Sequence, residues 1–199
     1  MFIETVSEAQ AKGDLREIYE GDRETFGFVP DHAKVFSLRP EVLKAWRAFQ
    51  GSIRGNLPLR RYELVTLAAA RALDSRYCQI AHGAVLTKSG MSVEQVRAIL
   101  ADFHDAGLEP VDVAIMGYAQ KVAMRAHEIT QSDIEALRSF GLEDVEILDI
   151  ALTATMRCFA SKTFDALGAG PDEAQRALED QLADLLPGKT SVTGTTGEG

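Results

Sequence analysis

A cysteine and a histidine four residues apart, Cys78 and His82, are the side chains of this sequence whose types and spacing best suit chemistry. Residues four apart lie on one face of a helix, so the imidazole can accept the thiol proton or hold the thiolate as an imidazolium. A helix that begins just after Asp74 or Ser75 places Cys78 in its first turn, where unpaired backbone N–H groups also stabilise a thiolate. The pair therefore predicts an activated cysteine nucleophile.

A carboxylate, Glu63, is the third candidate. It lies in "LPLRRYELVTLAAARA", and the apolar run that follows it directly indicates burial. A buried carboxylate needs a partner. If this helix and the helix of Cys78 form an antiparallel hairpin, His82 is that partner, and the three residues complete a carboxylate, imidazole and thiol relay.

Each candidate also has an ordinary structural explanation. Cysteine is among the most buried residue types, so Cys78 can be inert packing. His82 can be a core histidine with its hydrogen bonds satisfied, and Glu63 can pair with Arg60 or Arg61 on the surface. The spacing alone does not choose between the catalytic and the structural interpretation.

Ser75 and Cys158 are expected to have structural roles. Serine is a preferred N-cap residue, so the Ser75 hydroxyl is expected to accept a hydrogen bond from the backbone N–H of Tyr77 or Cys78 and to order the turn that presents the sulfur. Cys158, in "TATMRCFASK", lies on a long apolar helix and is expected in the core. It could resolve an oxidised Cys78 only at a Cα separation within about 7 Å.

The elements that must position these residues are helices. Apolar residues recur at i, i+3, i+4 and i+7, alternating β-type runs are missing, and the fold class is therefore all-α. The predicted helices span residues 13–26, 40–54, 58–73, 76–89, 92–102, 110–126, 131–140, 144–168 and 171–186. We expect a helical amino-terminal arm over 1–55, a helical core over 56–186 and a disordered tail over 187–199, which is small and polar.

Composition narrows the classes of function. The chain has 199 residues, 46% of them apolar, and a net charge of −9, which disfavours nucleic acid as a partner. The start "MFIETVSEAQAKGD" resembles no secretory leader, and no window suits a membrane span, so we expect a cytoplasmic protein with free thiols. The other histidines, His32, His104 and His127, have polar or loop-like surroundings and no companion at ligand spacing. No metal and no nucleotide or flavin cofactor is expected.

The run "LPLRRYELVTLAAARALDSRYCQIAHGAVLTKSGMSVEQVRAIL" resembles the core motif of the alkylhydroperoxidase D-like and carboxymuconolactone decarboxylase superfamily. That motif has a glutamate, eleven intervening residues, a Cys-x-x-Cys pair and a histidine four residues after the second cysteine. Glu63, Cys78 and His82 match it at unchanged spacing. "GDLREIYEGDRETFGFVPDHAKVFSLRPEVLKAW" resembles the arm of longer, peroxidase-related members and "TFDALGAGPDEA" their closing helix, so the likeness covers roughly residues 13–180 and implies their helical fold.

The chain departs from this pattern in three places. Ser75 replaces the first cysteine, so the vicinal disulfide of peroxidase members cannot form. Tyr77 stands where the peroxidase type can carry a further relay histidine. Ser161 and Lys162 stand where the family often has Asn-Arg. A single thiol can still be oxidised by a hydroperoxide to a sulfenic acid, but an external thiol must then restore it.

The resemblance and the residues together suggest a thiol-dependent, peroxidase-like enzyme. In it Cys78 attacks a small-molecule hydroperoxide, His82 is the base, Glu63 orients the imidazole, Ser75 and Tyr77 support them, and an external thiol is the reductant. One alternative is a redox-inactive acid–base enzyme of the decarboxylase type that acts on a small carboxylated metabolite through His82 and Glu63. Another is a non-catalytic assembly or ligand-binding module, in which Cys78 is buried and unreactive. The resemblance also implies a homo-oligomer.

Overall fold

The computed structural model describes residues 1–188, and this part of the chain forms α-helices and two 3-10 turns without a β-strand. The elements are α1 (Asp14–Phe26), α2 (Asp31–Val35), α3 (Pro40–Arg54), α4 (Leu59–Ala72), α5 (Arg76–Lys88), α6 (Val93–Asp102), α7 (Pro110–Arg125), η1 (Ala126–Glu128), α8 (Gln131–Ser139), α9 (Asp144–Ala166), η2 (Glu173–Gln175) and α10 (Arg176–Leu182). The predicted all-α class is confirmed. Of the predicted disordered tail, residues 189–199 lie outside the described residues.

The observed elements differ from the predicted ones at two places. Helix α2 (Asp31–Val35) was not predicted, because five residues make fewer than two turns and show no helical period. The predicted helix 171–186 is shorter: it starts as the 3-10 turn η2, which Asp172 and Gln175 close with reciprocal side-chain bonds, and continues as α10 to Leu182. The side-chain bonds between Asp172 and Gln175 therefore stabilise a 3-10 turn where the first turns of an α-helix were expected.

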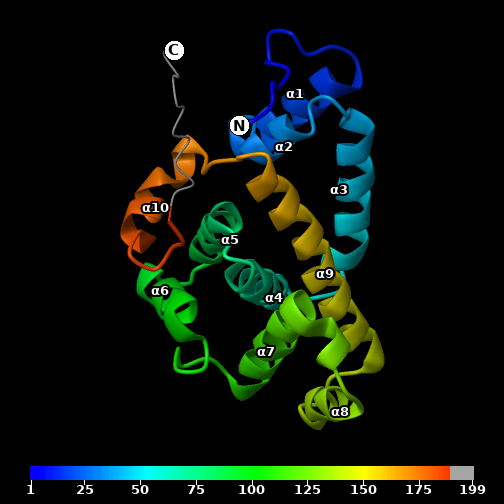
Figure 1. Ribbon diagram of the computed structural model, residues 1–199, viewed down its shortest axis with the longest axis vertical. Helices are drawn as coiled ribbons and strands as arrows, with labels where there is room; N and C mark the ends of the chain where they lie inside the picture. Colours follow the sequence, from blue (N-terminus) through cyan, green and yellow to red (C-terminus); the bar gives the residue numbers. More distant parts are fainter. Residues whose placement is uncertain (189–199) are drawn as a thin grey trace, which may run out of the picture.

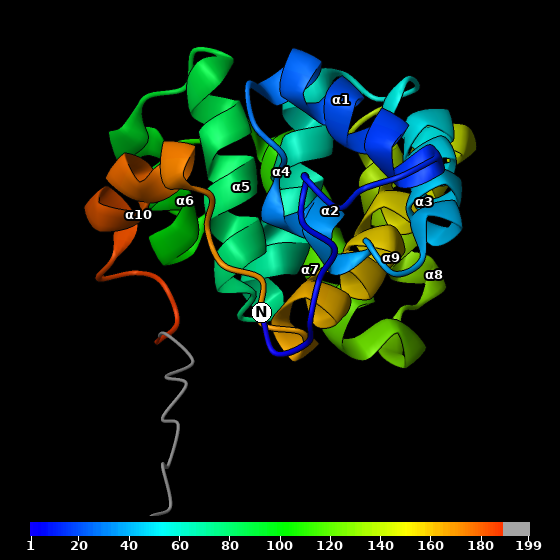
Figure 2. The ribbon, with the colours of Figure 1, turned by 90° about the horizontal axis from the view of Figure 1, so that it is seen from above.

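Helix α4 is the centre of the fold. Its residues 62–70 are all buried, and it contacts α5, α7 and α9. In Figures 1 and 2 it lies inside a ring of these helices, with α6 and α10 beyond α5 and the arm helices α1–α3 on the other side. A helix covered on all sides must be apolar all round, as "LVTLAAA" is. A carboxylate on this helix is therefore buried as well.

A tight turn joins α4 to α5 and fixes how the two helices pair. Asp74 has a φ of 53°, in the left-handed region that aspartate tolerates better than most residues. The N–H of Ser75 donates to the carbonyl of Ala70 at 3.0 Å, which satisfies one of the last carbonyls of α4. The chain thus reverses within three residues, and α5 returns antiparallel along α4 toward the turn that carries Glu63.

Helix α9 ties the arm to the core. It starts at a capping box made by Glu143 and Glu146, and one of its sides contacts α4, α5 and α7 while another contacts α3. Figure 1 shows α3 and α9 running side by side, with α1 and α2 at one end. The long helix therefore presents side chains to the core helices and to the arm at once.

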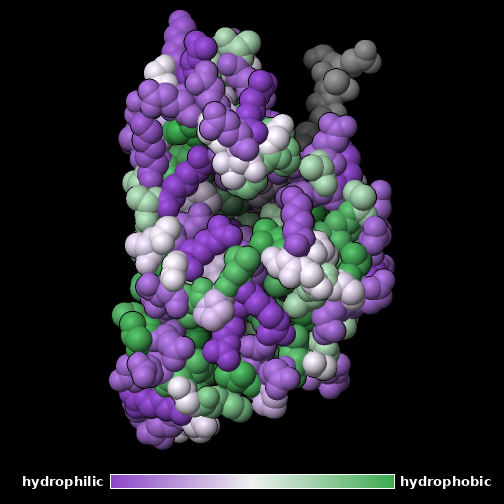
Figure 3. All heavy atoms as spheres, turned by 180° about the vertical axis from the view of Figure 1, so that it is seen from behind, coloured by the Kyte–Doolittle hydropathy of each residue, from purple (hydrophilic) through white to green (hydrophobic). Residues whose placement is uncertain are grey.

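The surface mixes hydrophilic and hydrophobic side chains on the face shown in Figure 3. No helix of the described residues is long and apolar enough to cross a membrane. Several large apolar side chains are nevertheless exposed on α3, at the end of α8 and on α9, namely Phe49, Phe140, Val145, Leu148 and Phe159.

Candidate functional site

The α4–α5 hairpin brings Glu63 and His82 together. The Nδ1 atom of His82 lies 2.6 Å from Oε2 of Glu63, and the carboxylate is only 2% exposed. Arg60 and Arg61 pair with Asp112 instead, so the surface alternative for Glu63 is wrong. The contact expected from an antiparallel hairpin is present.

His82 is held in its neutral form. Burial lowers the pKa of His82, the nearby Arg157 guanidinium lowers it further, and the Glu63 carboxylate opposes both effects. An imidazole whose pKa lies below about 6.5 is mostly neutral at pH 7. With the Glu63 carboxylate accepting from Nδ1–H, the lone pair is on Nε2, which makes His82 a base and not the imidazolium partner of a thiolate.

The cation beside the sulfur is Arg157 on α9. Its Nη1 donates to Sγ of Cys78 at 3.6 Å, and Cys78 is only 1% exposed. Within residues 1–188 no hydrogen bond joins His82 to Cys78, so the direct bond expected from their spacing is not formed. Arg157 belongs to no motif in the sequence; the one available signal is a basic residue within the mostly apolar "VEILDIALTATMRCFA".

Arg157 is an unusual buried cation. It is 2% exposed, its Nε has no hydrogen-bond partner, and among the described residues no carboxylate lies within ion-pair distance of it. Buried charges are normally paired, because removing a charge from water is costly. The contact with Cys78 is therefore the one polar interaction of this guanidinium that the described residues supply.

Ser75 starts α5, but its side chain does not cap the helix. The hydroxyl makes no bond to the first-turn N–H groups and instead donates to Oδ1 of Asp165 at 3.1 Å, so the capping prediction is wrong. The reason is tertiary: one face of α9 carries Arg157, Ser161 and Asp165, and this face runs along the start of α5 from Cys78 to Ser75. Ser161, between the two contacts, is fully buried and its hydroxyl has no partner.

Tyr77 connects α5 to the arm. Its hydroxyl accepts from the backbone N–H of His32 at 3.3 Å, lies 3.0 Å from Nδ1 of the same residue, and donates to Asp172 at 3.4 Å. Burial, and then the charge of Asp172, raise the pKa of Tyr77 well above its ordinary value. Tyr77 is therefore a neutral phenol that holds α2 against the core.

His32 does not have the polar surroundings expected from the sequence. Its ring packs against four aromatic side chains: Phe26, Trp46, Tyr77 and Phe164. Burial lowers the pKa of His32 to about 3, with smaller contributions from Arg47, Arg157 and His82. His104 and His127 are exposed, beside Asp102 and Glu128. Helix α2, missed in the sequence, is what brings His32 inside.

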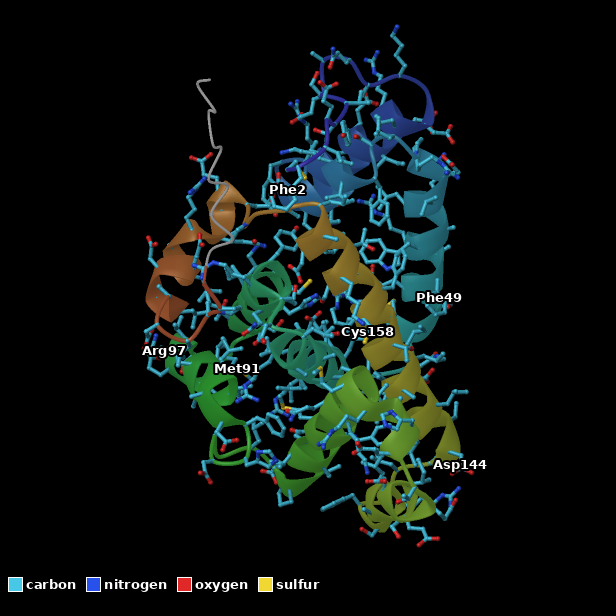
Figure 4. All side chains as sticks on the ribbon, in the orientation of Figure 1. Phe2, Phe49, Met91, Arg97, Asp144 and Cys158 are labelled. Carbon is cyan, nitrogen blue, oxygen red and sulfur yellow. The ribbon has the colours of Figure 1, made fainter. Side chains whose placement is uncertain are left out.

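Cys158 faces away from Cys78. Its Sγ lies 4.0 Å from the carbonyl of Ala123 on α7, while its neighbour Arg157 reaches toward α5. Consecutive side chains of an α-helix point about 100° apart, which accounts for the difference. Figure 4 shows Cys158 midway along α9, and both cysteines are free thiols. Burial raises the pKa of the Cys158 thiol, so at neutral pH this side chain is protonated and therefore less reactive than a thiolate.

A pocket of about 550 Å³ opens at the outer end of the α5–α9 seam. Tyr77, Asp165, Asp31, Arg76 and Arg176 are among its lining residues, and Cys78 is not. In the described residues no group of three or more His, Cys, Asp or Glu side chains could hold a metal ion. Tyr77 and Asp165 thus connect the site to this polar surface pocket.

Residues 40–121 match the carboxymuconolactone decarboxylase family. No curated protein matches the chain. Among solved structures, a peroxidase-related protein with an alkylhydroperoxidase AhpD core from Ralstonia eutropha JMP134 superposes with a TM-score of 0.81 at 24% identity, covering 87% of this chain and 93% of that one. A peroxidase-related protein from Silicibacter sp. TM1040 gives 0.76 at 20% identity, with coverage of 88% and 91%.

A third similar structure is a Cys-to-Ala form of the debrominase Bmp8 in complex with 2,3,4-tribromopyrrole, with a TM-score of 0.76 at 14% identity and coverage of 92% and 97%. Likeness at such identities concerns the fold, and proteins with this fold carry different names, so the fold does not fix the reaction. Residues 40–121 thus resemble the carboxymuconolactone decarboxylase family, and the chain shares the helical fold of these alkylhydroperoxidase D-like and peroxidase-related structures.

Proposed function

We propose that the protein is a thiol-dependent, peroxidase-like enzyme of the cytoplasm that uses Cys78 as its single reacting thiol. The observation that carries the proposal is the arrangement around that sulfur: a cation at 3.6 Å and, on the same face of α5, a neutral histidine bonded to a buried carboxylate. Cations near a cysteine favour the reactive thiolate, and a neutral imidazole is the form that accepts a proton. This arrangement is more typical of a nucleophilic cysteine than of an inert cysteine in a core.

The reaction follows from these roles. His82 takes the thiol proton on Nε2 while Glu63 keeps the ring oriented; because no hydrogen bond joins His82 to Cys78, the transfer needs a bridging water or a movement of the ring. The thiolate attacks the terminal oxygen of a hydroperoxide, the O–O bond breaks, and the proton held by His82 goes to the leaving oxygen. The products are an alcohol and a sulfenic acid on Cys78.

Regeneration requires an external thiol. Ser75 occupies the place of the first cysteine of the motif, and Cys158 faces α7. One external thiol condenses with the sulfenic acid and releases water, and a second thiol then reduces the mixed disulfide. The substrates are therefore a small hydroperoxide and a cellular thiol.

Trapping of the sulfenic acid tests this proposal. After modest hydroperoxide excess and a sulfenic-acid trap, mass spectrometry should find the adduct on the peptide that contains Cys78 and little on the peptide of Cys158, whose pKa is raised by burial. A Cys158→Ser variant should give the same yield on Cys78. Absence of an adduct on Cys78 in both proteins would count decisively against the peroxidase.

One observation favours a second candidate, the acid–base enzyme. Cys78 is 1% exposed, whereas the His82 and Glu63 pair is complete without it. A neutral imidazole oriented by a carboxylate can move a proton on a small carboxylated metabolite with no redox step. The same burial is what a non-catalytic module requires, and the trapping experiment separates that module from the peroxidase.

We also propose that the chain forms a homo-oligomer through the outer surface of α3 and α9. This surface carries an apolar groove of about 270 Å³, lined by Val42, Ala45, Trp46, Phe49, Met156 and Phe159. Phe49 and Phe159 are 45% and 48% exposed there, and exposed apolar clusters mark interaction surfaces.

Light scattering at micromolar concentration should give a multiple of the 21.7 kDa chain mass. Phe159→Glu should lower that mass, because it places a charge in the apolar surface, whereas Met124→Glu, at a similarly exposed position on α7, should not. A monomer mass for the unaltered protein contradicts the prediction.

A further inference from the structure

We propose that Arg157 is a catalytic residue of this site: its guanidinium is the counter-ion of the Cys78 thiolate and stabilises the leaving oxygen of the substrate. The inference rests on the proposed function and assigns a role that neither the motif spacing nor the family match contains. Arg157 lies on α9, outside residues 40–121 that match the family, and reaches the sulfur only through the packing of α9 on α5.

Arg157 is a charged side chain buried in the core. A guanidinium stays protonated at every pH that proteins tolerate, so Arg157 carries its charge into the core. It is 2% exposed and no carboxylate of the described residues pairs with it. An anion at Sγ, 3.6 Å from Nη1, supplies the compensation that such a cation requires.

The other charged or titratable groups near the Cys78 sulfur are already paired or neutral. On α4 the Glu63 carboxylate is engaged by His82, and Arg54 approaches it at 3.9 Å. On α5 His82 is neutral, and on α2 the ring of His32 is neutral as well. Arg157 is therefore the cation that contacts the sulfur.

Two hydrogen-bonding groups on one face of α9 have no partner among the described residues. Nε of Arg157 has no partner, and the fully buried hydroxyl of Ser161, one turn further along the same face of α9, has none either. Buried polar atoms are nearly always hydrogen-bonded, so a bound water or a substrate oxygen is expected to complete these two. Donors at this place suit an oxygen that gains negative charge as the O–O bond breaks.

The chemical step balances with these groups and one proton from water. The thiolate of Cys78 donates an electron pair to the terminal oxygen of R–O–O–H, forming the S–O bond as the O–O bond breaks, so sulfur is oxidised and the peroxide is reduced. The RO⁻ fragment leaves beside the Arg157 guanidinium and takes a proton that His82 relays from water, which gives the alcohol. Arg157 keeps its charge throughout and is neither acid nor base.

The experiment measures the thiolate directly, because a buried cysteine can escape alkylating reagents. In a Cys158→Ser background, the ultraviolet thiolate absorbance is recorded between pH 5 and 9, with the Cys78→Ser variant subtracted. The protein with Arg157 intact should show a thiolate at pH 7. Arg157→Met should lower the ratio of thiolate to thiol at that pH by about tenfold or more, a change that corresponds to one pKa unit.

Three comparisons decide between a catalytic and a structural role. Arg157→Lys, which keeps the charge but not the planar fork, should retain the thiolate band and yet reduce hydroperoxide about tenfold more slowly. Arg157→Gln replaces Arg157→Met if the latter does not fold. Arg47→Met removes a half-buried arginine bound to Asp22 at 2.8 Å and should cost stability without changing the band.

An absent thiolate band at pH 7 in the unaltered protein overturns the inference, and so does an unchanged band in Arg157→Met or Arg157→Gln. Failure of the proposed function looks different: the thiolate depends on Arg157, but no sulfenic acid forms with hydroperoxide. The two results are read from separate measurements, one without substrate and one with it.

Discussion

Replacement of Cys78 by serine is expected to lower the rate constant for hydroperoxide reduction by at least about a thousandfold, which is about 4 kcal/mol of transition-state stabilisation. A hydroxyl at this place stays protonated, and oxygen cannot form the sulfenic acid on which turnover depends. The side chain is nearly isosteric with cysteine and fully buried, so the fold should change little. The measurement is peroxide consumption coupled to oxidation of an added thiol.

The same variant separates the candidate functions. Proton-transfer activity on a small carboxylated substrate that survives Cys78→Ser supports the acid–base enzyme, because His82 and Glu63 remain bonded without the sulfur. Cys158→Ser is the matched control, and its peroxidase rate should equal that of the unaltered protein. Equal rates for Cys78→Ser and the unaltered protein contradict the role of Cys78.

Replacement of His82 by alanine is expected to lower the rate of reduction by about 10²- to 10⁴-fold, the usual contribution of a positioned general base. The variant removes the group that takes the thiol proton and leaves the buried Glu63 carboxylate with Arg54, 3.9 Å away, as its remaining ion-pair partner among residues 1–188. Rate measurements between pH 5 and 9 are informative here. Loss of a base should slow the reaction most at the acidic end, where hydroxide cannot replace it.

Glu63→Gln is a milder change to the same pair and is compared with His82→Ala. It keeps the imidazole and removes the charge that raises the pKa of His82, so the ring becomes a weaker base that is less firmly oriented. Its rate should fall between those of the unaltered protein and His82→Ala. A His82→Ala protein that folds and reduces hydroperoxide at full rate would refute the relay.

The sequence by itself determined the helices and one half of the site. Helical periodicity, together with prolines and glycines at the ends, marks the longer helices because these signals are local. The pairing of Glu63 with His82 could be predicted for a related reason. A three-residue turn leaves only an antiparallel hairpin, and a buried carboxylate on one helix then needs the imidazole on the other.

Tertiary structure decided what surrounds the sulfur. Whether Arg157 reaches Cys78, 79 positions earlier in the chain, depends on the rotation and height at which α9 packs on α5, and no local pattern encodes either quantity. The same packing gives Ser75 the carboxylate of Asp165 as a partner in place of the helix end. Likewise, only the short helix α2 brings His32 among aromatic rings. The spacing of side chains along one helix is a local property of the sequence. The residues that set the charge state of those side chains come from other helices of the fold.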